Sequence, residues 1–305
     1  MRIITFILTS ISIHRRIFLT FATHQQHSFM AQKKKTKLPY WLTILIVAIL
    51  WIGGDQLKSW LGMETEQQKI EKSAQEADMS GLEIPVISNG KQGQILQRTG
   101  YTLSYDTKNK TPQWVAWELT KEETKGKEER STEFYPDPDV IGTQVVTYDY
   151  SHSGYDRGHM APAGDMKWNK QAMQESFYMS NICPQDHNLN TEDWNDLEMK
   201  TREWARQYGK VYVVCGPIYT GKRNEYIGKN RVKVPDAFFK AILINDSKKQ
   251  YALGFLFENE AGERPLEKYL VPVDQLEKIT GMDFFSALPD ELENRLEEEV
   301  MNKLP

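Results

Sequence analysis

Residues 155–198 read YDRGHMAPAGDMKWNKQAMQESFYMSNICPQDHNLNTEDWNDLE, and two short parts of this stretch carry the side chains that organise the chain. The first part, Asp156-Arg157-Gly158-His159, places a fixed cation, a flexible backbone position and a titratable imidazole side by side. The second part runs from Ser180-Asn181 to Asn190, where a helix is expected to begin. We expect folding to bring the two parts together at one site, with the rest of the chain as support.

These residue types suit the hydrolysis of a phosphodiester bond. The reaction needs a base that deprotonates water, a cation that absorbs charge on the phosphate oxygens, and usually a hard metal ion beside the leaving oxygen. His159 can be the base, because an imidazole with an unperturbed pKa of about 6.5 is largely neutral near pH 7. Arg157 supplies the cation, and the side-chain oxygen of Asn190 is a ligand that magnesium accepts.

The joint pattern resembles the DNA/RNA non-specific endonucleases of the ββα-metal type, over roughly residues 101–285. The residues that carry the resemblance are Asp156-Arg157-Gly158-His159, Ser180-Asn181 with Pro184-Gln185, and Asn190 leading to Trp194 and Leu197-Glu198. The resemblance implies an α+β fold, in which a mixed or antiparallel sheet forms the core, helices cover its faces, and a ββα-metal motif forms the site.

The same resemblance implies a role for each of these residues. His159 would be the general base, and Asn190 the sole protein ligand of Mg²⁺, with Mn²⁺ as a substitute and water as the other ligands. Arg157, Asn181 and Glu198 fall on positions that this family uses to hold phosphate or metal-bound water. The products would carry 5′-phosphate ends, and no small-molecule cofactor is implied.

Four further residues are assigned supporting or binding roles. Arg130 lies where the family often carries an arginine that binds phosphate. Asn181 is either a core residue that forms hydrogen bonds or a contact to the substrate. Asp156 is expected to organise the motif by bonding to the backbone or to Arg157, and Gly158 supplies backbone freedom.

One long helix is expected over residues 190–208, because Trp194, Leu197 and Trp204 recur at helical spacing. Asn190 is also a good residue for the N-cap of that helix, a role compatible with a metal contact. Glu198 lies about 12 Å further along such a helix, at 1.5 Å per residue. Glu198 could therefore reach a metal-bound water only if Asn190 lies just before the helix.

The remaining segments predict a sheet scaffold. Expected strands cover residues 95–96, 101–105, 114–119, 177–179, 210–215, 232–234, 238–244 and 251–257. A turn is expected at Gly216-Pro217, and a short helix at residues 169–175. A further helix, with Asp274 as its candidate cap and Leu276 and Ile279 facing inward, should end at Gly281.

The composition is that of an ordinary folded protein. The formal net charge of −4 argues against a binder that depends on many phosphate contacts, although a local basic cleft would suffice for an enzyme. Cys183 and Cys215 are too few for a disulfide framework. We expect two buried apolar thiols, with a disulfide between them as the alternative.

The composition of the sequence changes along the chain and divides it into five segments. Residues 1–37 end in a lysine-rich segment expected to stay in the cytoplasm, and translation is expected to start at Met30. Residues 38–54 are apolar with Trp41 and Trp51 near their ends, which favours an uncleaved transmembrane helix over a cleaved signal. Residues 55–80 form a polar linker, residues 81–289 the endonuclease domain, and residues 290–305 an acidic C-terminal helix. The domain would then lie outside the cytoplasm, anchored to the membrane or secreted.

The leading hypothesis is an endonuclease that cuts DNA and RNA, because little in the sequence offers readout of bases and contacts would stop at phosphate and sugar. One alternative is a catalytically silent protein of the same fold that binds nucleic acid or acts at a surface. Another is a nuclease restricted to DNA. A homodimer is compatible with the sequence, and the biological role stays open.

Overall fold

The structure is a computed structural model that describes residues 81–88, 90, 92–246, 250–297 and 303–305. All of these residues belong to one compact unit of the chain, Glu64–Pro305. The expected membrane anchor at residues 38–54 and the segments on either side of it, up to residue 80, lie outside the described residues. Within the part that is described, no helix combines the length and apolar character needed to cross a membrane.

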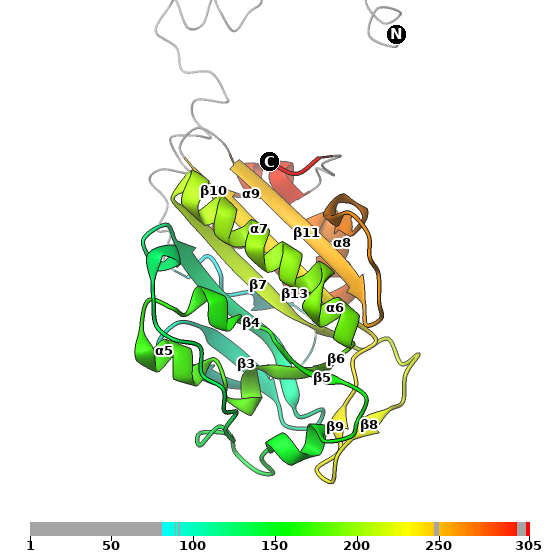
Figure 1. Cartoon of the computed structure of the whole chain (residues 1–305). Coiled ribbons are helices and arrows are strands. Elements are labelled where there is room, and N and C mark those ends of the chain that lie inside the picture. The colour runs from blue at the N-terminus through cyan, green and yellow to red at the C-terminus, as the bar shows by residue number, and fades with distance from the viewer. Residues whose placement is uncertain (1–80, 89, 91, 247–249, 298–302) are drawn as a thin grey trace, which may run out of the picture. The chain divides into compact units, whose positions relative to one another are not determined.

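Figure 1 shows the strands and helices along the chain. The strands are β1 (Val86–Ile87), β2 (Gln94–Gln97), β3 (Thr102–Asp106), β4 (Thr111–Thr120), β5 (Asp156–His159), β6 (Ile182–Gln185), β7 (Lys210–Ile218), β8 (Tyr226–Ile227), β9 (Val232–Lys233), β10 (Ala237–Asn245), β11 (Gln250–Glu258), β12 (Leu270–Val271) and β13 (Met282–Asp283). The α-helices are α5 (Lys170–Glu175), α6 (His187–Thr191), α7 (Asp193–Tyr208), α8 (Val273–Thr280) and α9 (Asp290–Glu297). The short 3₁₀ helices are η1 (Glu123–Lys125), η2 (Thr147–Tyr150), η3 (Ala163–Asp165), η4 (Met179–Asn181) and η5 (Leu266–Lys268).

A seven-stranded sheet in the order β12-β11-β10-β7-β4-β3-β2 forms the scaffold. Every neighbouring pair in it is antiparallel. The α+β class with an antiparallel sheet is thus confirmed.

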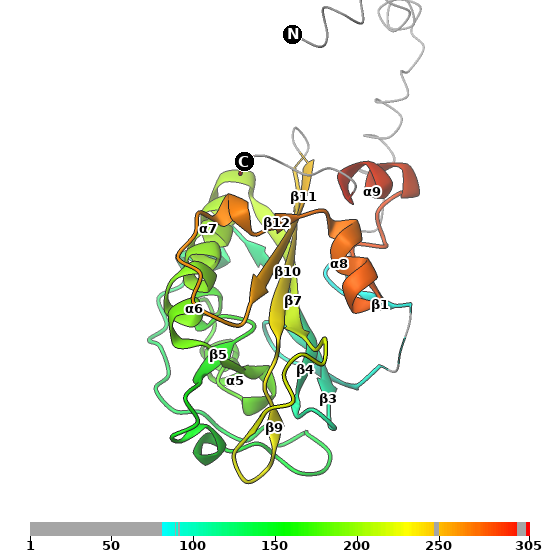
Figure 2. The ribbon, with the colours of Figure 1, turned by 90° about the vertical axis from the view of Figure 1, so that its right-hand side faces the viewer.

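Side chains alternate between the two faces of this sheet, as the period of two in a strand requires. Val213 and Phe238 join the apolar cluster that contains α7, whereas Val214 and Phe239 join the cluster that contains α8 and α9. Figure 2 shows the sheet edge-on, with α5, α6 and α7 on one side and α8 and α9 on the other. The central strands are therefore buried on both faces, which explains their nearly continuous apolar sequences.

Most of the expected elements are confirmed, several with their caps. The side chain of Asn169 caps α5 by accepting hydrogen bonds from the backbone N–H groups of Gln171 and Ala172. Gly281 ends α8 in the left-handed conformation, with φ of 70°. Cys183 and Cys215 are buried free thiols, so the alternative of a disulfide between them is wrong.

Other local expectations are wrong. Gly216-Pro217 is not a turn, because β7 continues to Ile218 and Pro217 pairs with Phe238 of β10. Pairing with β4 ends at Cys215, so Pro217 has a strand neighbour on one side, a position that tolerates proline. The segment 177–179 is no strand and leads instead into the 3₁₀ turn η4.

Two expectations for α8 are also wrong. Pro272, with no side-chain hydrogen bond, occupies its N-cap position in place of Asp274. Ile279 is 41% exposed, whereas Leu276 faces the core as expected.

Candidate active site

Strands β5 and β6 form a two-stranded antiparallel ribbon on the α7 side of the sheet, and α6 follows β6 directly. His159 is the last residue of β5 and pairs with Ile182. The side chain of Asp186 caps α6 by accepting from the backbone N–H groups of Asn188 at 2.9 Å and Leu189 at 3.2 Å. The expected N-cap role of Asn190 is therefore wrong, and its side chain is free for another contact.

The expected single helix over residues 190–208 is two helices. The chain bends at Glu192, which separates α6 from α7, so Asn190 belongs to a short helix of its own. Asn190 thus precedes the helix that carries Glu198, which is the arrangement in which both side chains can face one site.

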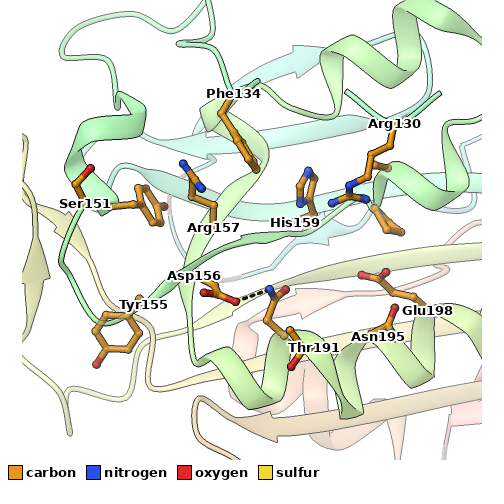
Figure 3. Close-up of a pocket in the computed structure, with 14 residues that line it drawn as sticks. Arg130, Phe134, Ser151, Tyr155, Asp156, Arg157, His159, Thr191, Asn195 and Glu198 are labelled. Carbon is orange, nitrogen blue, oxygen red and sulfur yellow. Dashed lines mark hydrogen bonds between the residues drawn. The ribbon is translucent and has the colours of Figure 1, made fainter. Parts of the chain in front are cut away.

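Most of the side chains predicted for the site meet in one cavity of about 650 Å³ (Figure 3). It is lined by Arg130, Phe134, Tyr150, Ser151, Tyr155, Asp156, Arg157, His159, Pro162, Ala163, Asn190, Thr191, Asn195 and Glu198. One imidazole, two guanidinium groups, two carboxamides and two carboxylates, from segments far apart in the sequence, therefore share one space.

The imidazole of His159 is held by two aromatic rings. Its centroid lies 5.3 Å from that of Phe134 and 4.7 Å from that of Phe177, in an edge-on contact with the latter. Burial, together with the charges of Arg130 and Arg157, lowers the pKa of His159 from 6.5 to about 3. The ring is therefore neutral at physiological pH and able to accept a proton.

The same two aromatic rings contact the guanidinium groups of the two arginines in the cavity. The guanidinium of Arg157 lies 4.6 Å from the centroid of Phe134, and that of Arg130 lies 5.3 Å from the centroid of Phe177. Cation–π contacts of this kind position a guanidinium without neutralising its charge. The cavity thus presents two guanidinium groups that phosphate can bind, on a chain of negative net charge.

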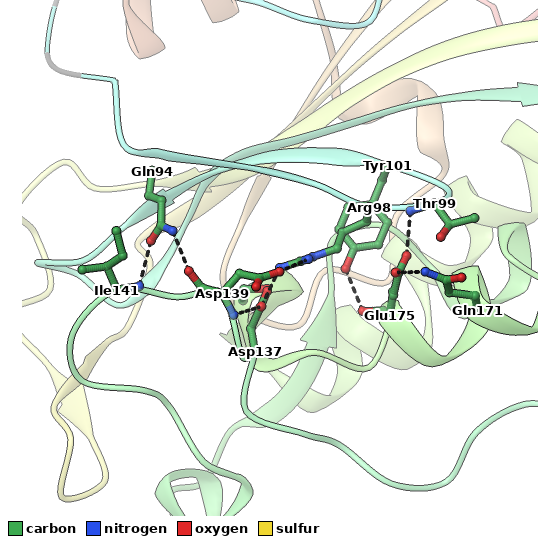
Figure 4. A network of polar contacts seen from close by, with 10 residues as sticks. Gln94, Arg98, Thr99, Tyr101, Asp137, Asp139, Ile141, Gln171 and Glu175 are labelled. Atoms are coloured by element: carbon green, nitrogen blue, oxygen red, sulfur yellow. Dashed lines mark hydrogen bonds and ion pairs between the residues drawn. The ribbon is translucent and has the colours of Figure 1, made fainter.

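The loop that carries Arg130 and Phe134 is fastened to β2 by a polar network that sequence reasoning did not find (Figure 4). Arg98 bridges Asp137 and Asp139, the latter at 2.6 Å, and Asp137 also accepts from the hydroxyl of Ser180. These bonds hold the loop against η4, beside His159.

The carboxylate of Asp156 bonds to partners that differ from the expected ones. Its Oδ2 accepts from the Nδ2 of Asn190 at 2.9 Å and lies 2.9 Å from the Nδ1 of His187, instead of binding the backbone or Arg157. Because the amide nitrogen of Asn190 is used in this way, the carbonyl oxygen is the atom left for a ligand. That oxygen is the donor type that a hard divalent cation takes, so the residues present fit such an ion.

Glu198 faces the cavity above a buried charge network. Burial raises the pKa of Glu198 to about 7, and the charges of Lys240 and Arg202 act in the opposite direction. Lys240, on β10, is 1% exposed, with its ammonium 3.9 Å from the centroid of Trp194. Arg202 donates to Asp165 at 2.7 Å. Sequence reasoning missed Lys240, although a lysine inside the apolar run 238–244 is a signal, since buried lysines need a partner.

Two predicted residues lie beneath the cavity. A Cβ on Gly158 would lie 2.1 Å from the Oε1 of Gln185, so this position requires glycine because of close approach. Asn181 is fully buried, and its amide bonds to the backbone of Ala161 and Ser176. The expected substrate contact of Asn181 is corrected accordingly, because its polar atoms are all used within the core.

A sequence model of the family described as DNA/RNA non-specific endonuclease matches residues 79–291. The chain belongs to this family. Bovine (Bos taurus) mitochondrial endonuclease G is 36% identical over 205 residues, which cover 63% of this chain and 69% of that protein. Human (Homo sapiens) mitochondrial nuclease EXOG is 39% identical over 207 residues, which cover 62% of this chain and 56% of that protein.

A solved structure agrees with the family assignment. The crystal structure of the EndoG/EndoGI complex, described as showing the mechanism of EndoG inhibition, matches with a TM-score of 0.61 and 32% identity. The match covers 67% of this chain and 91% of that one. The chain is therefore a nuclease of the hydrolase class, and the cavity at the end of its DRGH strand is the candidate active site of this nuclease.

Proposed function

We propose that this nuclease is a divalent-cation-dependent endonuclease that hydrolyses the phosphodiester bonds of DNA and RNA with little sequence preference and leaves 5′-phosphate ends. The observation that carries the proposal is the cavity shared by His159, Asn190 and two arginines. Mg²⁺ is the proposed ion, with Mn²⁺ as a substitute. The groups of the cavity can bind phosphate and water. Because the phosphate is the same in DNA and RNA, such contacts do not depend on the type of sugar.

Each residue of the cavity has a role in the proposed reaction. Neutral His159 accepts the proton of the attacking water, and Arg157 and Arg130 bind the non-bridging phosphate oxygens, for which guanidinium geometry is suited. Glu198 accepts hydrogen bonds from water in the cavity. A divalent cation held by Asn190 would neutralise charge on the leaving 3′ oxygen.

A nicking assay tests this proposal. The full-length protein should convert supercoiled plasmid to open circles with Mg²⁺ and lose that activity when EDTA is added. A parallel digestion of RNA should succeed under the same conditions, and the DNA ends should be substrates for ligase without prior phosphorylation. Undiminished cutting in EDTA would contradict the cation requirement, and intact RNA would restrict the nuclease to DNA.

Replacing Lys240 with methionine is expected to move the acid limb of the pH–rate profile to higher pH. A raised pKa means that Glu198 loses its carboxylate form as the pH falls through about 7, whereas His159, with a pKa of about 3, stays neutral. Because the charge of Lys240 opposes this rise, its removal raises the pKa of Glu198 further. The profile of kcat/KM from roughly pH 5 to 9, at one Mg²⁺ concentration, measures the shift.

Lys200→Met provides the matched control. Lys200 lies on α7, and its ammonium bonds to Glu203 at 3.0 Å. The control should reproduce the wild-type limb. A Lys240→Met profile that superimposes on that of the wild type would show that Lys240 does not act through Glu198.

We propose the location of the nuclease from the sequence. Residues 38–54 would anchor the chain in a membrane with residues 81–289 outside the cytoplasm, and secretion after cleavage is the alternative. Protease digestion of intact and permeabilised cells would separate an exported domain from one that stays inside.

A further inference from the structure

A cluster of carboxylates joins α8 to α9, on the opposite side of the sheet from the active site. Asp274 and Glu277 come from α8, and Glu297 comes from α9. One ligand oxygen from each of these three residues lies within 4.8 Å of the others. Leucines of both helices share one apolar cluster below, so packing of the helices forces the acidic groups together.

Glu277 accepts a hydrogen bond from the backbone N–H of Phe284 at 2.8 Å, but the carboxylate that α9 adds to the cluster has an oxygen without a partner among the described residues. Glu297 is 5% exposed, and its Oε1 has no hydrogen-bond partner among the described residues. The Oε1 of Glu293, one turn earlier in α9, is also buried without a partner in that part of the chain. An unpaired buried oxygen costs about 1–3 kcal/mol, and more when it is charged, so some group should satisfy it.

Nearby positive charge is insufficient for this purpose. Lys278 lies 3.6 Å from Asp274, but its side chain is 77% exposed. Asp283 places a further carboxylate near this cluster, and the ion pair that the cluster makes within the described residues is with the exposed Lys278.

We propose that Asp274, Glu277 and Glu297 bind a hard divalent cation of the calcium type, which links α9 to the rest of the domain. Calcium binds carboxylate oxygens at about 2.3–2.6 Å, so two oxygens on one ion lie at most about 5 Å apart. The spacing of 4.8 Å or less meets this limit without movement of the backbone. Glu293 is placed to take part as a fourth group, and flexible coordination suits calcium better than magnesium.

Calcium titration of the full-length Asn190→Ala variant tests the proposal apart from the candidate active site. Calorimetry should detect one bound Ca²⁺ per chain. The unfolding midpoint should rise by roughly 5–10 °C at about 100 times the dissociation constant. Adding Glu297→Gln, which preserves size but removes the charge, should abolish both effects, whereas the exposed control Glu291→Gln should preserve them.

Two outcomes would overturn the proposal. One is the absence of Ca²⁺ binding in Asn190→Ala, and the other is an equal shift of the midpoint with Glu297→Gln. If Glu297→Gln does not fold, the same comparison is made with the half-buried Glu277. The Glu297→Gln variant with Asn190 intact should cut plasmid in Mg²⁺ at the wild-type rate, so failure at this cluster leaves the proposed nuclease function standing.

Discussion

Replacing His159 with alanine is expected to lower the rate of phosphodiester hydrolysis by roughly 10²- to 10⁴-fold, the usual contribution of a general base. In the proposed mechanism, the neutral imidazole, next to the arginines of the cavity, accepts the proton of the attacking water. Arg130 and Arg157 stay in place, so we expect kcat to fall much more than KM changes. Steady-state kinetics on duplex DNA measures both.

The stability of His159→Ala supplies a second readout. The folded chain holds the pKa of His159 at about 3, whereas the unfolded value is about 6.5. The unfolded state therefore binds an additional proton between these values, and the wild type loses stability as the pH falls through this range. The variant lacks this loss, so its unfolding free energy should fall less steeply on acidification.

His152→Asn is the matched control for this prediction. His152 is exposed, with φ of 57°, a conformation that asparagine tolerates. Its replacement should leave the rate unchanged. Turnover of His159→Ala within about tenfold of the wild type would remove His159 from the mechanism.

The scaffold and the centre of the site were predictable because both depend on local sequence. The alternation of apolar residues in the strands reports the two faces of the sheet directly. The DRGH tetrapeptide lies on β5, which pairs with β6, and Asn190 lies on α6, which follows β6, so their meeting follows from one small ribbon and one helix.

Other features depend on partners that are distant in the sequence. The bend before α7 coincides with buried Asp193, which accepts a hydrogen bond from the hydroxyl of Tyr269, 76 residues away. Phe134 contacts His159 from a loop that Arg98, the residue after β2, fastens through Asp137. The helical spacing of apolar residues carries no information on either contact. It therefore predicted one continuous helix, and it did not predict that Phe134 packs against His159.

Replacing Asn190 with alanine is expected to lower activity by roughly 10²-fold or more at moderate Mg²⁺. The side chain of Asn190 offers the cavity an amide oxygen, and charge neutralisation by a bound metal ion is worth several kcal/mol, of which each 1.36 kcal/mol is tenfold in rate. The loss should appear mainly as a higher Mg²⁺ concentration needed for half-maximal rate. Asn188→Ala, an exposed residue of the same helix, is the control.

Asp156→Ala should produce a weaker form of the same defect. Asp156 accepts the hydrogen bond that orients the amide of Asn190, and loss of such support typically costs 10- to 100-fold in metal affinity or activity. Excess Mg²⁺ should therefore restore Asp156→Ala more fully than Asn190→Ala, because the ligand oxygen is still present. If Asn190→Ala required no more Mg²⁺ than the wild type, Asn190 would not be the metal ligand, and its bond to Asp156 would serve only to fix α6 against β5.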